Sequence, residues 1–245
     1  MHDILCRQMA VDFCCTEEAV RGRENCFTEH QFLEGRRRFH EGQECYLKIA
    51  VIGGKLLFCG RKDILEWCRA NYAKDGSEWF LEAKNVRRLN DRVHGDGYRI
   101  SFLHPFYIAE KATEVTYEGY NICWYEREDI EQFRGDNRFD EAYSFQESAP
   151  DVLGISAVRG GEILGMAGAS ADSPDMWQIG INVMQGHEGL GIGSTLVSLL
   201  KNELLARGKL PYYGTGFAHL ASQRLALSAG FHPAWVEMST EKMGG

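Results

Sequence analysis

Residues 175–193 read DMWQIGINVMQGHEGLGIG, and this stretch decides the fold of the sequence around it. Every second residue from Trp177 to Val183 is apolar, which predicts a β-strand. An apolar-periodic run from Ile192 to Leu204 predicts a helix that ends near Gly208. Between strand and helix the glycines are closely spaced, at Gly186, Gly189, Gly191 and Gly193. Because glycines let backbone N–H groups turn outward and a helix N-terminus is partially positive, this arrangement predicts an anion-binding turn.

Three kinds of phosphate-bearing cofactor use such a turn, and two of them do not fit the sequence. A nucleoside triphosphate loop needs a lysine before its Ser or Thr, but Gly193 precedes Ser194 and residues 162–200 contain no lysine. A dinucleotide site needs G-x-G-x-x-G and an acidic residue about 20 positions later. Here the spacing is G-x-G-x-G, and residues 205–235 contain no Asp or Glu. The pyrophosphate of coenzyme A is the remaining candidate.

Two segments resemble motifs of the GNAT superfamily of acyl-CoA-dependent N-acetyltransferases. Residues 188–193, EGLGIG, resemble its Q/R-x-x-G-x-G/A turn. Residues 219–231, HLASQRLALSAGF, resemble its N-x-x-S-x-R-x-A-x-x-x-G-F helix, which packs beside the pantetheine arm of the cofactor. The preceding residues 179–183, IGINV, resemble the strand that the family splays open to receive the thioester. The resemblance covers approximately residues 118–245.

The resemblance implies an α+β fold with two parts. Residues 116–245 are expected to form a GNAT-like mixed sheet with flanking helices, and residues 1–115 a smaller α+β domain of unknown role. The residue patterns predict hairpins around Gly53-Gly54 and Gly160-Gly161. They also predict helices over 62–72, 78–93, 128–145 with a break at Gly135, and 219–229, and strands over 98–108, 121–125, 209–216 and 234–238.

Composition narrows the class of protein. The chain has 245 residues, 44% of them hydrophobic and 25% charged, with a net charge of −8, so we expect no nucleic-acid partner. No signal peptide or apolar run long enough for a membrane span is evident, so we expect a cytoplasmic protein without a membrane partner. All eight cysteines precede residue 124, without the C-x2-C pairs of a zinc site, so we expect no metal. The oligomeric state is left open.

The resemblance implies acetyl-CoA as co-substrate and a set of residues that contact it. Backbone groups of the splayed strand are expected to meet the pantetheine arm and the oxyanion, and the turn and the two helices are expected to supply the remaining contacts. The expected cofactor-binding residues are Ile181, Asn182, Val183, Glu188, Gly189, Leu190, Gly191, Ile192, Gly193, Ser194, His219 and Ser222.

The sequence departs from the family at three positions. Glu188 stands where Arg or Gln is frequent, His219 where the family has Asn, and Ala226 where a Tyr often protonates the departing thiolate. Tyr213, His219 and Ser228 are the candidate replacements for that acid.

A base for the attacking amine is sought next to the central strand. Asp172, Asp175 and Gln178 cluster at its start, although residues 171–175 equally fit an ordinary hairpin turn. The candidate catalytic residues are therefore Asp172, Gln178, Tyr213 and His219.

These residues predict acetyl transfer from acetyl-CoA to an amine. No cysteine follows Cys123, so the C-terminal half offers no thiol for a covalent acyl intermediate, and direct attack in a ternary complex is favoured. A small-molecule amine is the expected acceptor, since a net charge of −8 favours the approach of a cation. The alternative is a non-catalytic acyl-CoA-binding or sensor protein with the same fold.

Overall fold

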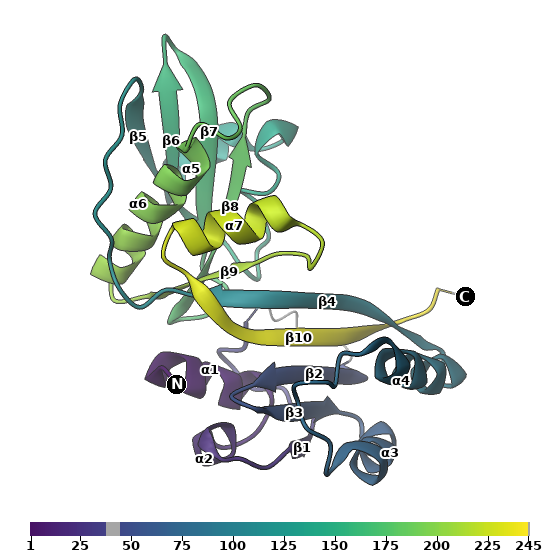
Figure 1. The fold of residues 1–245 in the computed structure, drawn as a ribbon. Coiled ribbons are helices and arrows are strands. Elements are labelled where there is room, and N and C mark those ends of the chain that lie inside the picture. Colours follow the sequence, from purple (N-terminus) through teal and green to yellow (C-terminus); the bar gives the residue numbers. More distant parts are fainter. Residues whose placement is uncertain (38–44, 245) are drawn as a thin grey trace. The chain divides into compact units, whose positions relative to one another are not determined.

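The computed structural model describes residues 1–37 and 45–244. These residues form two compact units (Figure 1). Unit 1 contains residues 1–36, 45–106 and 234–244, and unit 2 contains Arg37 and residues 107–233. The sequence predicted a domain boundary between residues 115 and 116, whereas this partition puts 107–115 in unit 2 and 234–244 in unit 1. The boundary between independently folding domains stays a prediction.

Unit 1 is an α+β unit built on a sheet with the strand order β1-β3-β2-β10-β4. The pair β1–β3 is parallel, and β2 is antiparallel to both β3 and β10. Its strands are β1 (Cys26–Glu29), β2 (Leu47–Ile52), β3 (Lys55–Gly60), most of β4 (Tyr98–Ile108) and most of β10 (His232–Lys242). Its helices are α1 (Asp3–Asp12), α2 (Glu17–Arg21), α3 (Lys62–Tyr72) and α4 (Ala83–Gly95).

Unit 2 is a mixed sheet with the strand order β9-β8-β7-β6-β5. Only β8–β9 is parallel among these pairs. The strands are β5 (Asn121–Glu126), β6 (Asp151–Arg159), β7 (Glu162–Ser170), β8 (Met176–Val183) and β9 (Leu210–Gly214). The helices are α5 (Arg127–Ile130), α6 (Ile192–Ala206) and α7 (Leu220–Ser228), with short 3₁₀ turns at Glu131–Phe133 and Asn137–Phe139. The predicted α+β class with a mixed sheet in the C-terminal half is confirmed.

Both predicted hairpins are confirmed, and their turns explain the paired glycines. Gly53 and Gly54 join β2 to β3 with φ of 57° and 81°, and Gly160 and Gly161 join β6 to β7 with φ of 61° and 86°. Two successive residues with positive φ make the type I′ turn, whose twist matches that of the two strands. The predicted helices over 62–72 and 219–229 are also present, the second as α7.

The two faces of the unit 2 sheet carry different cores because successive side chains of a strand point to opposite faces. On one face Ile155, Ala167 and Ile179 pack with residues of α6 and α7, such as Leu196 and Ala226. On the other face lies a second cluster, which contains Ile130, Phe133, Phe139, Ala142, Tyr143 and Met166. The segment before β6 therefore covers the face opposite to α6 and α7.

A row of three glycines lets that segment lie against the sheet. Gly154, Gly168 and Gly180 are direct partners across β6, β7 and β8. A Cβ atom on Gly168 would stand 2.1 Å from the carbonyl oxygen of Ala142, and one on Gly180 would stand 1.8 Å from that of Glu141. Only glycine permits this approach, because real Cβ atoms do not come so close to a carbonyl oxygen.

The long helix predicted over 128–145 is wrong. The segment begins with α5 and two 3₁₀ turns, and it then runs without helix along the glycine row. Gly135, with φ of 83°, separates the two 3₁₀ turns. The apolar residues whose spacing suggested a helix are instead supplied to the second core by α5, the two 3₁₀ turns and the non-helical segment that follows them.

We expect Gly168→Ala to destabilise unit 2, because the added methyl group would overlap the carbonyl oxygen of Ala142, 2.1 Å away. Overpacking of this kind costs about 1–3 kcal/mol. Gly216→Ala is the matched control, since a Cβ there meets nothing within 4 Å, and its effect should stay within about 0.5 kcal/mol. Urea unfolding of both variants measures the difference. Equal stabilities would show that the glycine row is not needed for close approach.

Candidate active site

The strands β8 and β9 pair over a short distance and then separate. Their ladder runs from Met176–Leu210 to Gln178–Tyr212 and ends there. β8 continues to Val183, still paired with β7 on its other side. The described part of unit 2 therefore has a sheet that opens on the β9 side of β8.

The alternation of backbone groups decides which residues of β8 face this opening. The N–H of Leu210 donates to the carbonyl of Asp175 at 2.9 Å, so odd-numbered residues of β8 direct their polar backbone groups toward β9. Ile181 and Val183 consequently direct theirs into the opening. Asn182 directs its backbone groups toward β7. Of the three strand residues expected to contact the cofactor, Ile181 and Val183 therefore direct their backbone groups into the opening, and Asn182 does not.

The Asn182 side chain forms hydrogen bonds with the segment before β6, a role that the sequence did not predict. Its Oδ1 accepts hydrogen bonds from the N–H groups of Glu141 at 3.1 Å and Ala142 at 2.8 Å. Its Nδ2 donates to the carboxylate of Asp140 at 3.1 Å. Asn182 therefore fastens the segment that lies over the glycine row.

The glycine turn that follows β8 is open to solvent. Gly186, Gly189 and Gly191 have φ of 85°, 74° and 81°, and a Cβ at any of them would meet nothing within 4 Å. Gly191 caps α6 without any side-chain hydrogen bond to the first turn, so the leading N–H groups of α6 remain available to an anion. The Ser194 hydroxyl donates to the carbonyl of Gly191 at 2.9 Å, and the Leu190 side chain is 65% exposed.

Glu188, the residue that departs from the family motif, folds back onto this turn. Its Oε2 accepts a hydrogen bond from the N–H of Gly186 at 2.7 Å. One outward-facing amide of the turn is therefore occupied by a carboxylate of the protein itself.

Gly193 and Ile192 serve packing as well as the turn. A Cβ on Gly193 would stand 2.7 Å from Cδ1 of Leu225 and 3.1 Å from Cγ2 of Val183. Its lack of a side chain lets α6 approach α7 and the end of β8. Ile192 is buried in the same core, so these two residues can offer a ligand only their backbone groups.

A buried polar network lies at the last rung of the β8–β9 ladder, where the opening begins. The Tyr212 hydroxyl donates to Oδ2 of Asp172 and lies 3.1 Å from Oε1 of Gln178. The Ser170 hydroxyl donates to Oδ1 of Asp172. The guanidinium of Arg37 stands over the Tyr212 ring, 5.6 Å from its centre. Two predicted catalytic residues, Asp172 and Gln178, are thus brought together by a third that the sequence reasoning missed.

A second hydroxyl pair lies on the opposite face of β9. The Tyr213 hydroxyl is 2.8 Å from the hydroxyl of Ser222 on α7, and both side chains are buried. Burial raises the pKa of Tyr213. The Tyr213 hydroxyl therefore carries its proton at neutral pH.

The remaining candidates lie apart from both pairs. Asp175 is exposed in the turn before β8, while Asp172 is buried, so the two carboxylates do not form one surface site. His219 precedes α7 with an exposed side chain, and Ser228 is exposed at the end of that helix.

The described residues offer neither a metal site nor a membrane-spanning helix. Within residues 1–37 and 45–244, no group of three His, Cys, Asp or Glu side chains is placed to hold a metal ion. None of the helices in these ranges combines the length and the apolar character that crossing a membrane requires.

Comparison with known proteins assigns the family. The profile of the acetyltransferase (GNAT) family matches residues 113–231, which include β8, the glycine turn, α6 and α7. A search of curated protein sequences finds no match.

Solved structures of similar fold were also found. A GCN5-related N-acetyltransferase-like protein from Streptococcus suis is 18% identical, with a TM-score of 0.48 over 86% of this chain and 89% of that chain. A GCN5-related N-acetyltransferase from Kribbella flavida is 16% identical, with a TM-score of 0.46 over 65% of this chain and 64% of that chain. The family profile carries the assignment, and through residues 113–231 the chain belongs to the GNAT acetyltransferase superfamily.

Proposed function

We propose that this protein is an N-acetyltransferase that moves an acetyl group from acetyl-CoA to an amine by direct attack in a ternary complex. Membership of the GNAT superfamily supports acyl transfer in general. One observation supports the finer proposal most strongly: the open edge of β8 at Ile181 and Val183 leads directly into the open glycine turn and the uncapped N-terminus of α6.

The residues present fit acetyl-CoA. Backbone N–H groups from Gly189 to Ser194 are arranged around an open turn that suits a pyrophosphate. The backbone groups of Ile181 and Val183 suit the amides of a pantetheine arm, which would continue the interrupted ladder. When bound, acetyl-CoA supplies an acetyl group activated as a thioester.

The network around Tyr212 is suited to accept a proton from the attacking amine. In our proposal the amine proton passes to the Tyr212 oxygen while the Tyr212 proton moves along its existing hydrogen bond to Asp172. Ser170 donates to the other oxygen of Asp172 and fixes the orientation of the carboxylate. Tyr212 lies at the start of the opening, because its pairing with Gln178 is the last one between β8 and β9.

Tyr213 is our proposed acid for the departing thiolate. The family often uses a Tyr at the position of Ala226, and Ala226 belongs to the same buried cluster as Tyr213. The Tyr213 phenol on β9 therefore lies in the same cluster as the position on α7 at which the family often has its Tyr. Burial raises the pKa of the Tyr213 hydroxyl, so it carries a proton at neutral pH that it could pass to the departing thiolate.

A small-molecule amine remains our proposal for the acceptor, on the basis of the net charge of −8. Asp172 is not suited to hold an ammonium group at the surface, because it is buried and both of its oxygens accept hydrogen bonds. We also propose a cytoplasmic location, a compartment in which the eight free cysteines would stay reduced.

A non-catalytic acyl-CoA-binding or sensor protein is the second candidate. Glu188 favours it, because its carboxylate occupies an amide of the turn and places a negative charge beside the expected pyrophosphate. Binding without transfer would identify this function.

Acetyl-CoA should bind to the glycine turn, and Gly191→Glu should abolish binding by placing a charged side chain in it. At 100 times its Kd the ligand should stabilise the parent protein by about 2.7 kcal/mol. Gly161→Glu is the matched control, because Gly161 also has positive φ, 86° against 81°, and an open surrounding, but lies in a hairpin. Calorimetry and thermal melts measure both variants. Unchanged binding in Gly191→Glu would place the cofactor elsewhere.

A screen of small primary amines with acetyl-CoA should identify an acceptor, and the initial-rate lines for the two substrates should intersect. With that amine, Asp172→Asn should lower kcat/KM about ten-fold or more, equivalent to about 1.4 kcal/mol. Asp175→Asn is the control and should stay near the parent value, because Asp175 is exposed and outside the network.

Three outcomes separate the hypotheses. Parallel initial-rate lines together with an acetylated protein would contradict direct attack. Parental kcat/KM in Asp172→Asn, with acetyl-CoA affinity and melting temperature retained, would remove Asp172 from the mechanism. Intact acetyl-CoA binding with no transfer to any amine would support the sensor function.

A further inference from the structure

Two cysteines of unit 1, Cys14 and Cys45, gather around the thiol of Cys59 on β3. Cys59 pairs with Thr28 of β1 on one side and with Lys48 of β2 on the other, so it lies in the middle of three strands. Its side chain is fully buried. The thiols of Cys14 and Cys45 both interact with it, although they come from distant parts of the sequence.

Cys14 is held on one side of this cluster. It follows α1 in the left-handed region, with φ of 53°, a conformation uncommon outside glycine. Its Sγ accepts a hydrogen bond from the N–H of Gln31 at 3.3 Å and lies 3.4 Å from the Gln31 carbonyl. The Thr28 hydroxyl donates to the carbonyl of Phe13 and so ties this corner to β1. The Cys14 thiol is therefore held against the backbone of Gln31.

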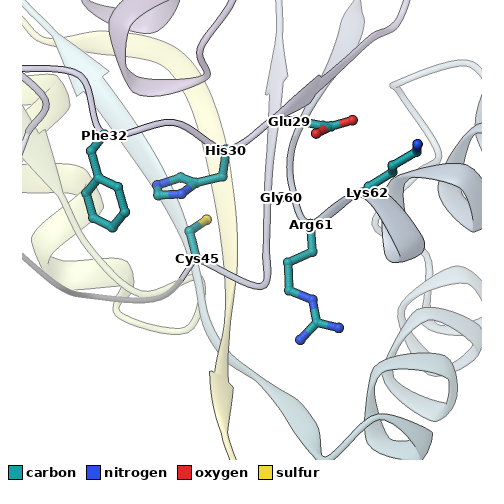
Figure 2. A pocket seen from close by; sticks show the side chains of 7 residues that line it. All are labelled: Glu29, His30, Phe32, Cys45, Gly60, Arg61 and Lys62. Carbon is teal, nitrogen blue, oxygen red and sulfur yellow. The ribbon is translucent and has the colours of Figure 1, made fainter.

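Cys45 lies on the other side, where it lines a pocket of about 380 Å³. Figure 2 shows its side chain on the same side of the pocket as His30 and Phe32, with Arg61 and Lys62 on the other side. Its Sγ is 3.9 Å from the carbonyl oxygen of Cys59. Of the three clustered thiols, Cys45 is thus the one that a small molecule in the pocket would meet.

The surroundings lower the pKa of Cys45, as they lower that of Cys14, so both favour a thiolate and access through the pocket distinguishes Cys45. The interaction with the Cys59 thiol lowers the pKa of Cys45 most, and the positive charges of Lys48 and Arg36 lower it further. His30 does not supply that charge. Burial, helped by Arg36 and Lys48, lowers the pKa of His30 to about 4, so its ring is neutral at pH 7. The nucleophile is therefore activated by a thiol and two cations instead of an imidazolium.

We propose that this pocket is a thiol–disulfide exchange site for a small disulfide that carries carboxylates, in which Cys45 reacts first and Cys59 then closes an internal disulfide. The pocket gives access to Cys45, and the buried Cys59 is adjacent to it. The site lies within unit 1 and is independent of the proposed acetyl transfer.

The reaction balances in two exchanges. The Cys45 thiolate attacks one sulfur of the small disulfide, a mixed disulfide forms, and one small thiol leaves. The Cys59 thiol then attacks the Cys45 sulfur, the Cys45–Cys59 disulfide forms, and the second small molecule leaves as a thiolate that takes up the Cys59 proton. One disulfide is reduced to two thiols, and two protein thiols are oxidised to one disulfide.

The charge of the pocket indicates the class of disulfide. Arg61 and Lys62 contribute two cations to the lining, and Glu29 contributes one carboxylate, but Arg61 is paired with Asp63 at 2.9 Å. Arg36, which contacts the lining residue His30, adds a further positive charge. Attraction to this excess of positive charge favours a disulfide with carboxylates over one with ammonium groups. Glutathione disulfide has the required groups, and cystamine is the cationic counterpart.

To test the proposal, the full-length reduced protein is incubated with glutathione disulfide at pH 7 and the reaction is quenched with acid. Free thiols are then alkylated, and disulfides are mapped after digestion with trypsin. The three thiols are separable, because Cys45 falls in residues 39–48, Cys59 in 56–61 and Cys14 in 8–21. We expect a glutathione adduct on 39–48 at early times, followed by a link between 39–48 and 56–61. Cystamine should react several-fold more slowly.

Variants separate the roles of the two thiols. Cys59→Ser should stop the reaction at the Cys45 adduct, and Cys45→Ser should leave residues 56–61 unmodified. If Cys59→Ser does not fold, the early adduct in the parent protein tests the same order of steps. Cys68 is the internal comparison, because it is fully buried and does not line the pocket, so it should not react.

Several results would overturn the proposal. A first adduct on residues 8–21, or a link between 8–21 and 56–61, would make Cys14 or its neighbour Cys15 the reacting thiol. No adduct on 39–48, under conditions in which the unfolded protein reacts there, would remove the site. Equal rates with glutathione disulfide and cystamine would contradict the proposed ligand class.

Discussion

The separation of β8 from β9 is the constraint on which the site in unit 2 depends. After Gln178 the odd-numbered residues of β8 have polar backbone groups directed away from β7 and toward a strand that no longer pairs with them. Backbone groups left without partners are costly unless water or a ligand satisfies them. The rest of unit 2 holds β8 in this position: β7 pairs along its other edge, Asn182 and the glycine row fix the segment over one face, and Gly193 brings α6 close to its end.

The central strand, the turn and the helix could be predicted because each has a local physical cause. The two hairpins follow from Gly-Gly pairs that supply two positive φ angles, and the turn before α6 follows from glycines with the same property. Local patterns failed over residues 128–145. There the three glycines that receive the segment lie on β6, β7 and β8, so the cause is a contact between distant parts of the chain.

The polar groups of the candidate site divide in the same way. Asp172 and Gln178 were predicted as catalytic candidates from their position beside the central strand, whereas Tyr212 was not considered although Tyr213 was. The alternation of β9 places these neighbours on opposite faces, with Tyr212 beside Asp172 and Tyr213 beside Ser222. This arrangement could have been predicted, because a strand over 209–216 already implies that neighbouring side chains point to opposite faces. The thiol cluster had no such signal, because only the pairing of β1, β3 and β2 brings residues 14, 45 and 59 together.

Hydrogen–deuterium exchange resolved to single amides, with and without coenzyme A, tests the central claim most directly. We predict that coenzyme A slows exchange at Ile181 and Val183, whose N–H groups face the opening, and at the first turn of α6. The N–H of Asn182 should change little, because it already faces β7. Protection at Asn182 alone, or coenzyme A binding that leaves Ile181 and Val183 unchanged, would contradict the claim that the cofactor continues the interrupted ladder.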